Sequence, residues 1–214
     1  MGDHVQHESV RRSYDTVAEE YAVRLFGEIA EKPLDRALLA ALLEQTAPDA
    51  PIADLGCGPG HVAAWFVDHG ARAIGIDLSA GMIEAGRRRF DGVSFRQGDL
   101  LDLPARDGEF GSAVALYTII HLAPEERDRA FREMARVLRP LGLLLLSFHV
   151  GEEVRHLDEW WGHDVDLDFR FLDPAHVAGL LEAAGFVVEM RMERAPYAHE
   201  ADTRRGYLLA RRAG

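Results

Sequence analysis

A glycine-rich loop occupies residues 54–60, which read Asp-Leu-Gly-Cys-Gly-Pro-Gly and follow a short apolar run. Its glycines stand at alternate positions, and residues without a Cβ let a ligand lie against the main chain. A second apolar run, 74–76, ends in Asp77. Strand, glycine loop, helix, strand and acid in this order are typical of nucleoside sites, in which the acid accepts hydrogen bonds from ribose. The pattern predicts such a site.

Short apolar runs alternate with segments of helical periodicity along most of the chain. They predict strands at 51–55, 72–77, 93–97, 111–117 and 141–149, and helices at 9–24, from Pro33, and at 60–69, 80–89, 124–138 and 174–184. Two further strands, 186–192 and 206–210, have no helix between them. The sequence therefore predicts an α/β fold: a doubly wound, mostly parallel, seven-stranded sheet with an antiparallel C-terminal edge hairpin.

Two segments lie outside this alternation. Residues 1–32 are expected to form an N-terminal helical segment that covers the active site, and residues 33–214 the ligand-binding domain. Within that domain, residues 150–173 form a connection that is too long and too aromatic for a simple loop. We expect a lid there, built together with the N-terminal helix; packing against that helix alone is the alternative.

Composition limits the partners. A net charge of −12 argues against a nucleic-acid substrate, because phosphate contacts need basic surface. The longest apolar run, 141–146, is too short to cross a bilayer, and the N-terminus shows no signal peptide. Cys57 is the one cysteine, which suits a reducing compartment. We expect a cytoplasmic monomer or homodimer that acts on a small molecule, without nucleic acid or membrane.

The chain resembles the class I S-adenosylmethionine-dependent methyltransferases, closely over residues 50–150. The resemblance rests on the glycine loop, on 75–79 (Gly-Ile-Asp-Leu-Ser), 80–83 and 97–100 (Gln-Gly-Asp-Leu), and on 133–140, which ends in Leu-Arg-Pro. It implies the seven-stranded Rossmann-like methyltransferase fold, S-adenosylmethionine as cofactor and S-adenosylhomocysteine as product. Leu141 stands where many relatives carry a glycine, which we interpret as a variant turn.

The resemblance also assigns cofactor contacts. Asp77 would accept from both ribose hydroxyls, and Asp99 and the amide of Leu100 would read the adenine. Asp54 would hold the ammonium group or brace the loop. The full set of implied cofactor residues is Asp54, Gly56, Gly58, Gly60, Asp77, Leu78, Met82, Asp99, Leu100, Tyr117, Tyr14 and Tyr21. Core packing is the alternative for Met82, Tyr14 and Tyr21.

Methyl transfer needs alignment and a nucleophile that can lose its proton. His121, just after the fourth strand, is the best-placed group for that proton, because its pKa lies near neutrality. A pocket-shaping role is the alternative, and His149 is a second candidate, assigned here to the substrate site. Residues 117–121, at the end of the fourth strand, contain no acid that could hold a metal, and the alternating Asp164, Asp166 and Asp168 are expected to be a solvated loop strip.

Arg170 lies between two phenylalanines in the lid segment, and a guanidinium can clamp a carboxylate. We therefore predict an anionic small-molecule acceptor, held by Arg170 and enclosed by Trp160 and Trp161, with O- or N-methylation. A surface arginine paired with Asp168 is the alternative. For the whole protein, the competing functions are a protein or RNA methyltransferase and a non-catalytic S-adenosylmethionine-binding protein.

Overall fold

A computed structural model describes residues 2–214, with side chains from His7 onward. Met1, the first residue of the predicted segment 1–32, lies outside the described residues. A seven-stranded sheet has the order β3-β2-β1-β4-β5-β9-β8, in which β3 to β5 are parallel and β9 and β8 are antiparallel. The predicted doubly wound fold with an antiparallel C-terminal edge is confirmed.

The strands of this sheet are β1 (Ile52–Leu55), β2 (Ala73–Asp77), β3 (Ser94–Gln97), β4 (Phe110–Leu116), β5 (Leu138–His149), β8 (Phe186–Arg194) and β9 (Arg205–Arg212). The α-helices are α1 (Gly2–Arg24), α2 (Pro33–Gln45), α3 (His61–Asp68), α4 (Ala80–Arg89), α5 (Arg127–Val137) and α6 (Pro174–Ala183). Short 3-10 helices span Glu28–Glu31, Ile119–His121 and Pro124–Glu126. Most boundaries lie within three residues of the predicted ones, while α1 begins earlier.

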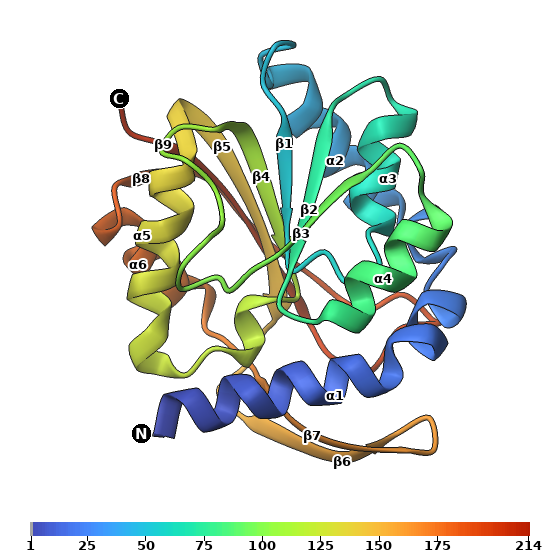
Figure 1. Ribbon diagram of the computed structural model, residues 1–214. Coiled ribbons are helices and arrows are strands. Elements are labelled where there is room, and N and C mark those ends of the chain that lie inside the picture. The colour runs from blue at the N-terminus through green and yellow to red at the C-terminus, as the bar shows by residue number, and fades with distance from the viewer. Residues whose placement is uncertain (1) are drawn as a thin grey trace.

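The central strands are buried because helices cover both faces of the sheet. Helices α2, α3 and α4 lie on one face, and α5 and α6 on the other (Figure 1). All four residues of β1 are buried, as are six of the seven in β4. This packing fixes the carboxyl ends of the parallel strands along one edge of the sheet, where α/β folds place their ligands.

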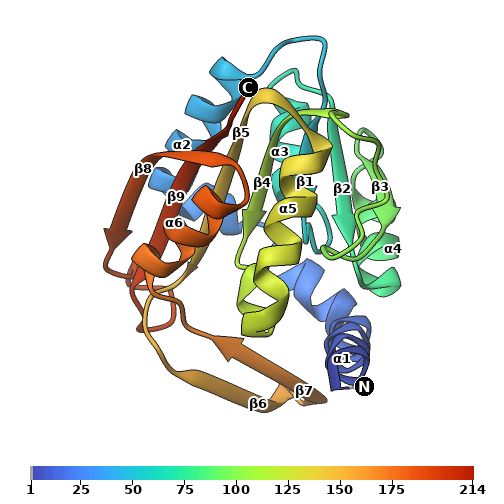
Figure 2. The same cartoon turned by 90° about the vertical axis from the view of Figure 1, so that its left-hand side faces the viewer.

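Residues 150–173 are not an irregular loop. They contain a separate β-hairpin, β6 (Val154–Trp160) paired with β7 (His163–Arg170), which extends beyond the sheet (Figure 2). The acid strip predicted in a loop therefore lies in a strand, where side chains alternate between two faces. Val165 and Leu167 are buried, whereas Asp164 and Asp166 are exposed.

The hairpin and α1 lie together across the carboxyl edge of the sheet (Figure 1). Val17 and Ala18 of α1 form one small apolar cluster with Val165 and Leu167 of β7. Ser9 Oγ also donates to Asp166 Oδ2 over 2.5 Å. None of the helices in the described part of the chain is long and apolar enough to cross a membrane.

Leu141 has φ +66° and is 61% exposed. A left-handed backbone at a residue with a Cβ is strained, so glycine would adopt this conformation more easily than leucine. The strand itself begins earlier than predicted, at Leu138, directly after α5 ends. Leu141 is therefore an irregularity within β5, in place of the turn we expected before it.

Candidate functional site

A cavity of about 750 Å³ lies between the carboxyl edge of the sheet and the layer that α1 and the hairpin form across it. It collects residues that are far apart in the sequence. The predicted residues that line it are Tyr14, Tyr21, Asp54, Gly56, Gly58, Asp77, Leu78, Met82, Asp99, Leu100, Tyr117, His121, His149, Trp160 and Trp161. Gly60 and Arg170 are not among the lining residues.

The glycine loop turns through left-handed conformations, with φ +70° at Gly56, +54° at Gly58 and +86° at Gly60. A Cβ on Gly56 would lie 2.1 Å from Thr118 Cγ2, so only glycine fits there. Gly60 is the N-cap of α3, and a Cβ there would lie 2.5 Å from the Phe95 ring of β3. Its bare backbone therefore also allows the loop to pack against β3.

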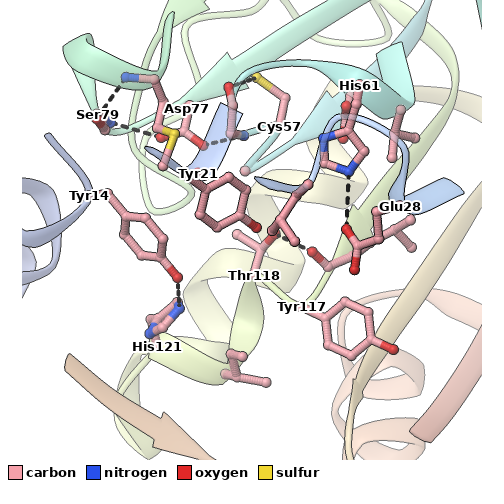
Figure 3. Close-up of a pocket in the computed structure, with 18 of the residues that line it drawn as sticks. Tyr14, Tyr21, Glu28, Cys57, His61, Asp77, Ser79, Tyr117, Thr118 and His121 are labelled. Atoms are coloured by element: carbon pink, nitrogen blue, oxygen red, sulfur yellow. Dashed lines mark hydrogen bonds and ion pairs between the residues drawn. The ribbon is translucent and has the colours of Figure 1, made fainter. Parts of the chain in front are cut away.

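Asp77 holds the loop at the end of β2. Its Oδ2 accepts from the Gly58 amide over 2.7 Å, and its Oδ1 accepts from the Ser79 amide over 2.8 Å (Figure 3). Burial raises its pKa to about 6, which leaves the carboxylate ionised at neutral pH. Each oxygen retains lone-pair capacity for a further donor. The geometry therefore suits a group with two adjacent hydroxyls.

Asp54 Oδ2 accepts from the Ala63 amide over 3.0 Å, in the first turn of α3. Burial raises the pKa of Asp54 to about 7. Of the two roles considered for this acid, bracing the loop against the helix is visible in these contacts. Met82 is 1% exposed and packs in the cluster with Val17 and Ala18, so it lines the cavity and belongs to the core at once.

His7 is a site residue that the sequence did not reveal. Its Nδ1 lies 2.9 Å from Asp99 Oδ2, and its Nε2 lies 2.9 Å from Glu126 Oε1. The hydrogen bond to Asp99 is the main reason why the pKa of His7 rises to about 9. Asp99 Oδ1 also accepts from the Leu101 amide. The start of α1 is thus attached to the predicted adenine-reading acid, a contact over 92 residues that no local pattern signals.

This contact predicts a pH dependence of stability. The pKa of His7 is about 9 in the folded protein and 6.5 as its ordinary value. Because the folded state holds the proton more tightly, the stabilisation is fully present below pH 6.5 and is lost as the pH rises through 9. Urea unfolding at pH 6, 7.5 and 9 should show this loss in the natural protein. His7→Gln should lack it; an unchanged pH slope in that variant would contradict the assignment.

His121 and Tyr14 form a hydrogen-bonded pair between the 3-10 helix after β4 and α1. Tyr14 Oη lies 2.7 Å from His121 Nε2, and His121 Nδ1 lies 3.0 Å from the Asp168 carbonyl oxygen (Figure 3 shows the first contact). Because a carbonyl only accepts, Nδ1 carries the proton and Nε2 accepts from Tyr14. Burial lowers the pKa of His121 to about 4 and raises that of Tyr14. The pair is neutral at physiological pH.

Aromatic side chains from α1 and the hairpin close the cavity. Tyr21 meets Trp160 edge-on at 5.7 Å and Trp161 at 6.0 Å between ring centroids, and Tyr14 meets Trp160 at 6.0 Å. Phe169 lies 5.0 Å from the His121 ring. Edge-to-face contacts of this kind stabilise a packed wall. The wall joins the two segments that were predicted to form a lid.

The prediction for Arg170 is corrected by its position. Its Nη1 lies 3.2 Å from Asp168 Oδ2, and the side chain does not line the cavity. Successive side chains of a strand point to opposite faces. Phe169 lines the cavity, so its neighbour Arg170 points away from it. The alternative outcome, pairing with Asp168, is the one observed.

The other end of the cavity carries charges that sequence analysis missed. Lys32 is 5% exposed; its Nζ forms an ion pair with Glu28 and lies 3.6 Å from Glu200 Oε1. Although burial opposes ionisation, hydrogen bonds from His61 and Lys32 and their charges lower the pKa of Glu28 to about 2. The His61 Nε2–Glu28 Oε2 distance is 3.4 Å. Glu28 and Lys32 are four residues apart, whereas His61 and Glu200 are brought to them only by the fold.

His149 and Tyr117 lie beside these charges. Tyr117 adopts φ +55° directly after β4, and its ring lies 5.1 Å from that of His149. His149 Nδ1 lies 2.8 Å from Thr203 Oγ1, and its ring stacks on Phe171 at 5.2 Å. Burial, with the charge of Arg205, lowers the pKa of His149 to about 4. Among the side chains that the structure describes, from His7 to Gly214, no three His, Cys, Asp or Glu residues form a group that could hold a metal ion.

Comparison with known proteins shows which proteins this chain resembles. Residues 52–142 match the family model described as "Methyltransferase domain". The chain is 39% identical over 103 residues to methyltransferase GfsG of Streptomyces halstedii, a match over 45% of this chain. It is 32% identical over 136 residues to a probable tRNA methyltransferase 9B of Bos taurus, a match over 63% of this chain. These matches cover 36% and 29% of the relatives' own lengths, so the chain corresponds to only part of each.

Among solved structures, magnesium protoporphyrin IX methyltransferase from Synechocystis, with S-adenosylmethionine bound, superimposes with a TM-score of 0.74. The superposition covers 97% of each chain at 17% identity. At that identity the likeness shows the fold alone.

Proposed function

Because the chain belongs to the class I S-adenosylmethionine-dependent methyltransferases, whose cofactor is S-adenosylmethionine, we propose that it transfers the methyl group to a small-molecule acceptor. The observation that carries the proposal is one cavity at the carboxyl edge of the sheet. The glycine loop and Asp77 lie in it together with an aromatic wall of Tyr14, Tyr21 and Trp160. A cavity of about 750 Å³ has room for a cofactor and a compact second molecule.

The residues present fit the cofactor. Gly56 and Gly58 leave the main chain bare in a place where a Cβ on Gly56 would collide with Thr118. Asp77 would hold the ribose, and Asp99 and Leu100 the adenine, next to Leu78. When bound, S-adenosylmethionine supplies an electrophilic methyl group on a sulfonium. The protein's own task is then to align the acceptor and exclude water.

We propose that Tyr14 and His121 move the acceptor's proton. The Tyr14 oxygen would accept the proton from the acceptor, while the proton that Tyr14 now donates would pass to His121 Nε2 over the observed 2.7 Å. The Asp168 carbonyl keeps Nδ1 protonated and Nε2 available. Burial makes the histidine a weak base, which suits an acceptor that loses its proton as the methyl group arrives.

The lid assignment belongs to this proposal. Helix α1 and the β6–β7 hairpin would open to admit ligands and close over them, as the N-terminal and 150–173 segments were expected to do. Their mutual contacts, Ser9 to Asp166 and Tyr21 to Trp160, support joint movement. We place the reaction in the cytoplasm, since Cys57 is the one cysteine of the sequence. We also propose that the protein acts as a monomer or a homodimer.

An RNA acceptor is the second candidate, because one relative is named as a probable tRNA methyltransferase. The net charge of −12 disfavours it, since nucleic-acid affinity depends on phosphate contacts with Lys and Arg.

Transfer of a labelled methyl group from S-adenosylmethionine decides between these functions. We expect label in the small-molecule fraction of a panel of phenols, ketones, acids and amines. Label in stripped RNA or in protein alone would replace the small-molecule proposal. Binding of S-adenosylhomocysteine without any transfer would indicate a non-catalytic binding protein.

A further inference from the structure

Sheet topology separates one end of the cavity from Asp77. We call this end the distal chamber and define it by Lys32, Tyr117, His149, Glu200 and Arg205, all of which line the cavity. Tyr117 directly follows β4, His149 ends β5 and Arg205 begins β9. In the sheet, these strands lie on the other side of β1 from β2, the strand that ends in Asp77. Figure 3 shows Tyr117 across the cavity from Asp77, with Tyr21 and Thr118 between them. An acceptor beside the cofactor would lie here.

The charges of the distal chamber already have partners. Lys32 is paired with Glu28 and approaches Glu200. Glu200 also receives both terminal nitrogens of Arg194, over 2.6 and 2.9 Å. Asp35, which lines the same end, lies 3.4 Å from Arg194. With Arg205, three cations face three carboxylates, so an anionic ligand would add an unpaired charge to a buried, balanced site.

The hydrogen-bond donors of the distal chamber, unlike its charges, are not all matched by acceptors. Tyr117 Oη and Arg205 Nε are buried, and neither donates a hydrogen bond to a residue that the structure describes. Tyr207 approaches Tyr117 Oη only as a donor. Arg205 is 4% exposed, and its Nε lies 3.9 Å from Glu200 Oε1, beyond hydrogen-bond distance. His149 Nδ1 lies 2.8 Å from Thr203 Oγ1, which also accepts from Arg205. Buried donors without acceptors are costly unless a ligand supplies oxygen.

The walls between these donors are flat and apolar. The rings of Tyr117 and His149 line the cavity 5.1 Å apart, and Phe171, which is not among the lining residues, stacks behind His149 at 5.2 Å. Phe169 and Trp160 also line the cavity and contact each other edge-on at 5.9 Å. A planar, conjugated molecule would satisfy such walls better than a flexible one.

We propose that the acceptor is an uncharged, planar molecule that presents a carbonyl oxygen to Tyr117 Oη and Arg205 Nε. This inference rests on the proposed function and specifies its substrate class. A carbonyl oxygen accepts two hydrogen bonds and carries no proton that would itself need a hydrogen-bond partner. A carboxylate would accept equally well but would disturb the charge balance, and this replaces the anionic acceptor expected at Arg170.

Three small molecules of similar size test the inference. Each is titrated into the complex of the protein with S-adenosylhomocysteine, and its binding is measured by NMR. They are 4-hydroxyacetophenone, with a neutral carbonyl, 4-hydroxybenzoate, with a carboxylate, and 4-ethylphenol, with neither. We expect the ketone to bind at least about fivefold more tightly than the other two. Tyr117→Phe should remove most of that preference, because it deletes only the hydroxyl donor. Tyr197→Phe, a tyrosine outside the cavity lining, should leave it intact.

Equal or tighter binding of the carboxylate overturns the inference. So does a failure of all three probes to bind, or a preference that survives Tyr117→Phe with unchanged affinity for S-adenosylhomocysteine. The proposed function fails separately, if no small molecule in the labelled-methyl panel is methylated. A protein that methylates only anions would keep the proposed function and lose this inference.

Discussion

Replacing Asp77 with alanine is expected to weaken S-adenosylhomocysteine binding by at least about tenfold. The carboxylate is predicted to accept two charge-assisted hydrogen bonds from the ribose, each of about 1.5–3 kcal/mol, and 1.4 kcal/mol is a factor of ten. The change also removes the acceptor of the Gly58 and Ser79 amides, so the loop loses its anchor. Both effects act in the same direction. Calorimetric titration with S-adenosylhomocysteine measures their sum.

Asp91→Ala is the matched control, because Asp91 is exposed and does not line the cavity. It should bind S-adenosylhomocysteine like the natural protein. Circular dichroism must show that Asp77→Ala is folded. Unchanged affinity in the folded variant would refute the ribose assignment and with it the identity of the cofactor-binding edge.

Replacing His121 with alanine is expected to lower the rate of methyl transfer by about 10²–10⁴, the range of general acid–base catalysis. Tyr14→Phe should lower it by a similar factor, because it removes the hydroxyl that links the acceptor to His121 Nε2. Cofactor affinity should stay within about twofold in both variants. Single-turnover kinetics with labelled S-adenosylmethionine separates the chemical step from binding.

His176→Ala controls for the loss of a histidine, since His176 is exposed on α6. If the two residues act as one relay, the double variant should be little slower than either single variant. A loss below about threefold in His121→Ala would leave the histidine as a shaping residue. Catalysis would then rest on alignment or on His149.

The fold could be predicted because its signals are local. The loop of 54–60 and Asp77 are close in sequence. Each strand of the seven-stranded sheet coincides with a short apolar run, and most predicted boundaries lie within three residues of the observed ones. The absence of a helix between β8 and β9 was enough to predict the antiparallel edge. The hairpin of 154–170 escaped because its alternation of acids and apolar residues was interpreted as a solvated loop.

The candidate site was predictable only in part. Asp77, Gly56 and Gly58 belong to motifs, and the structure brings them to one cavity. Arg170 and Gly60 do not line that cavity. Whether a side chain such as Arg170 faces a cavity depends on the register of its strand. One residue of shift reverses the face of a strand.

The sequence by itself determined the α/β class, the parallel sheet with its antiparallel edge, and the nucleoside-binding edge, because these depend on periodicity and on backbone conformations that only glycine adopts easily. Tertiary structure alone decided that His7 meets Asp99, that Tyr14 meets His121 and that Lys32 meets Glu200. These pairs join α1, loops and strand ends over long separations. Their energies come from hydrogen bonds and from charge pairing at close range, and neither is encoded in the spacing of residues along the chain.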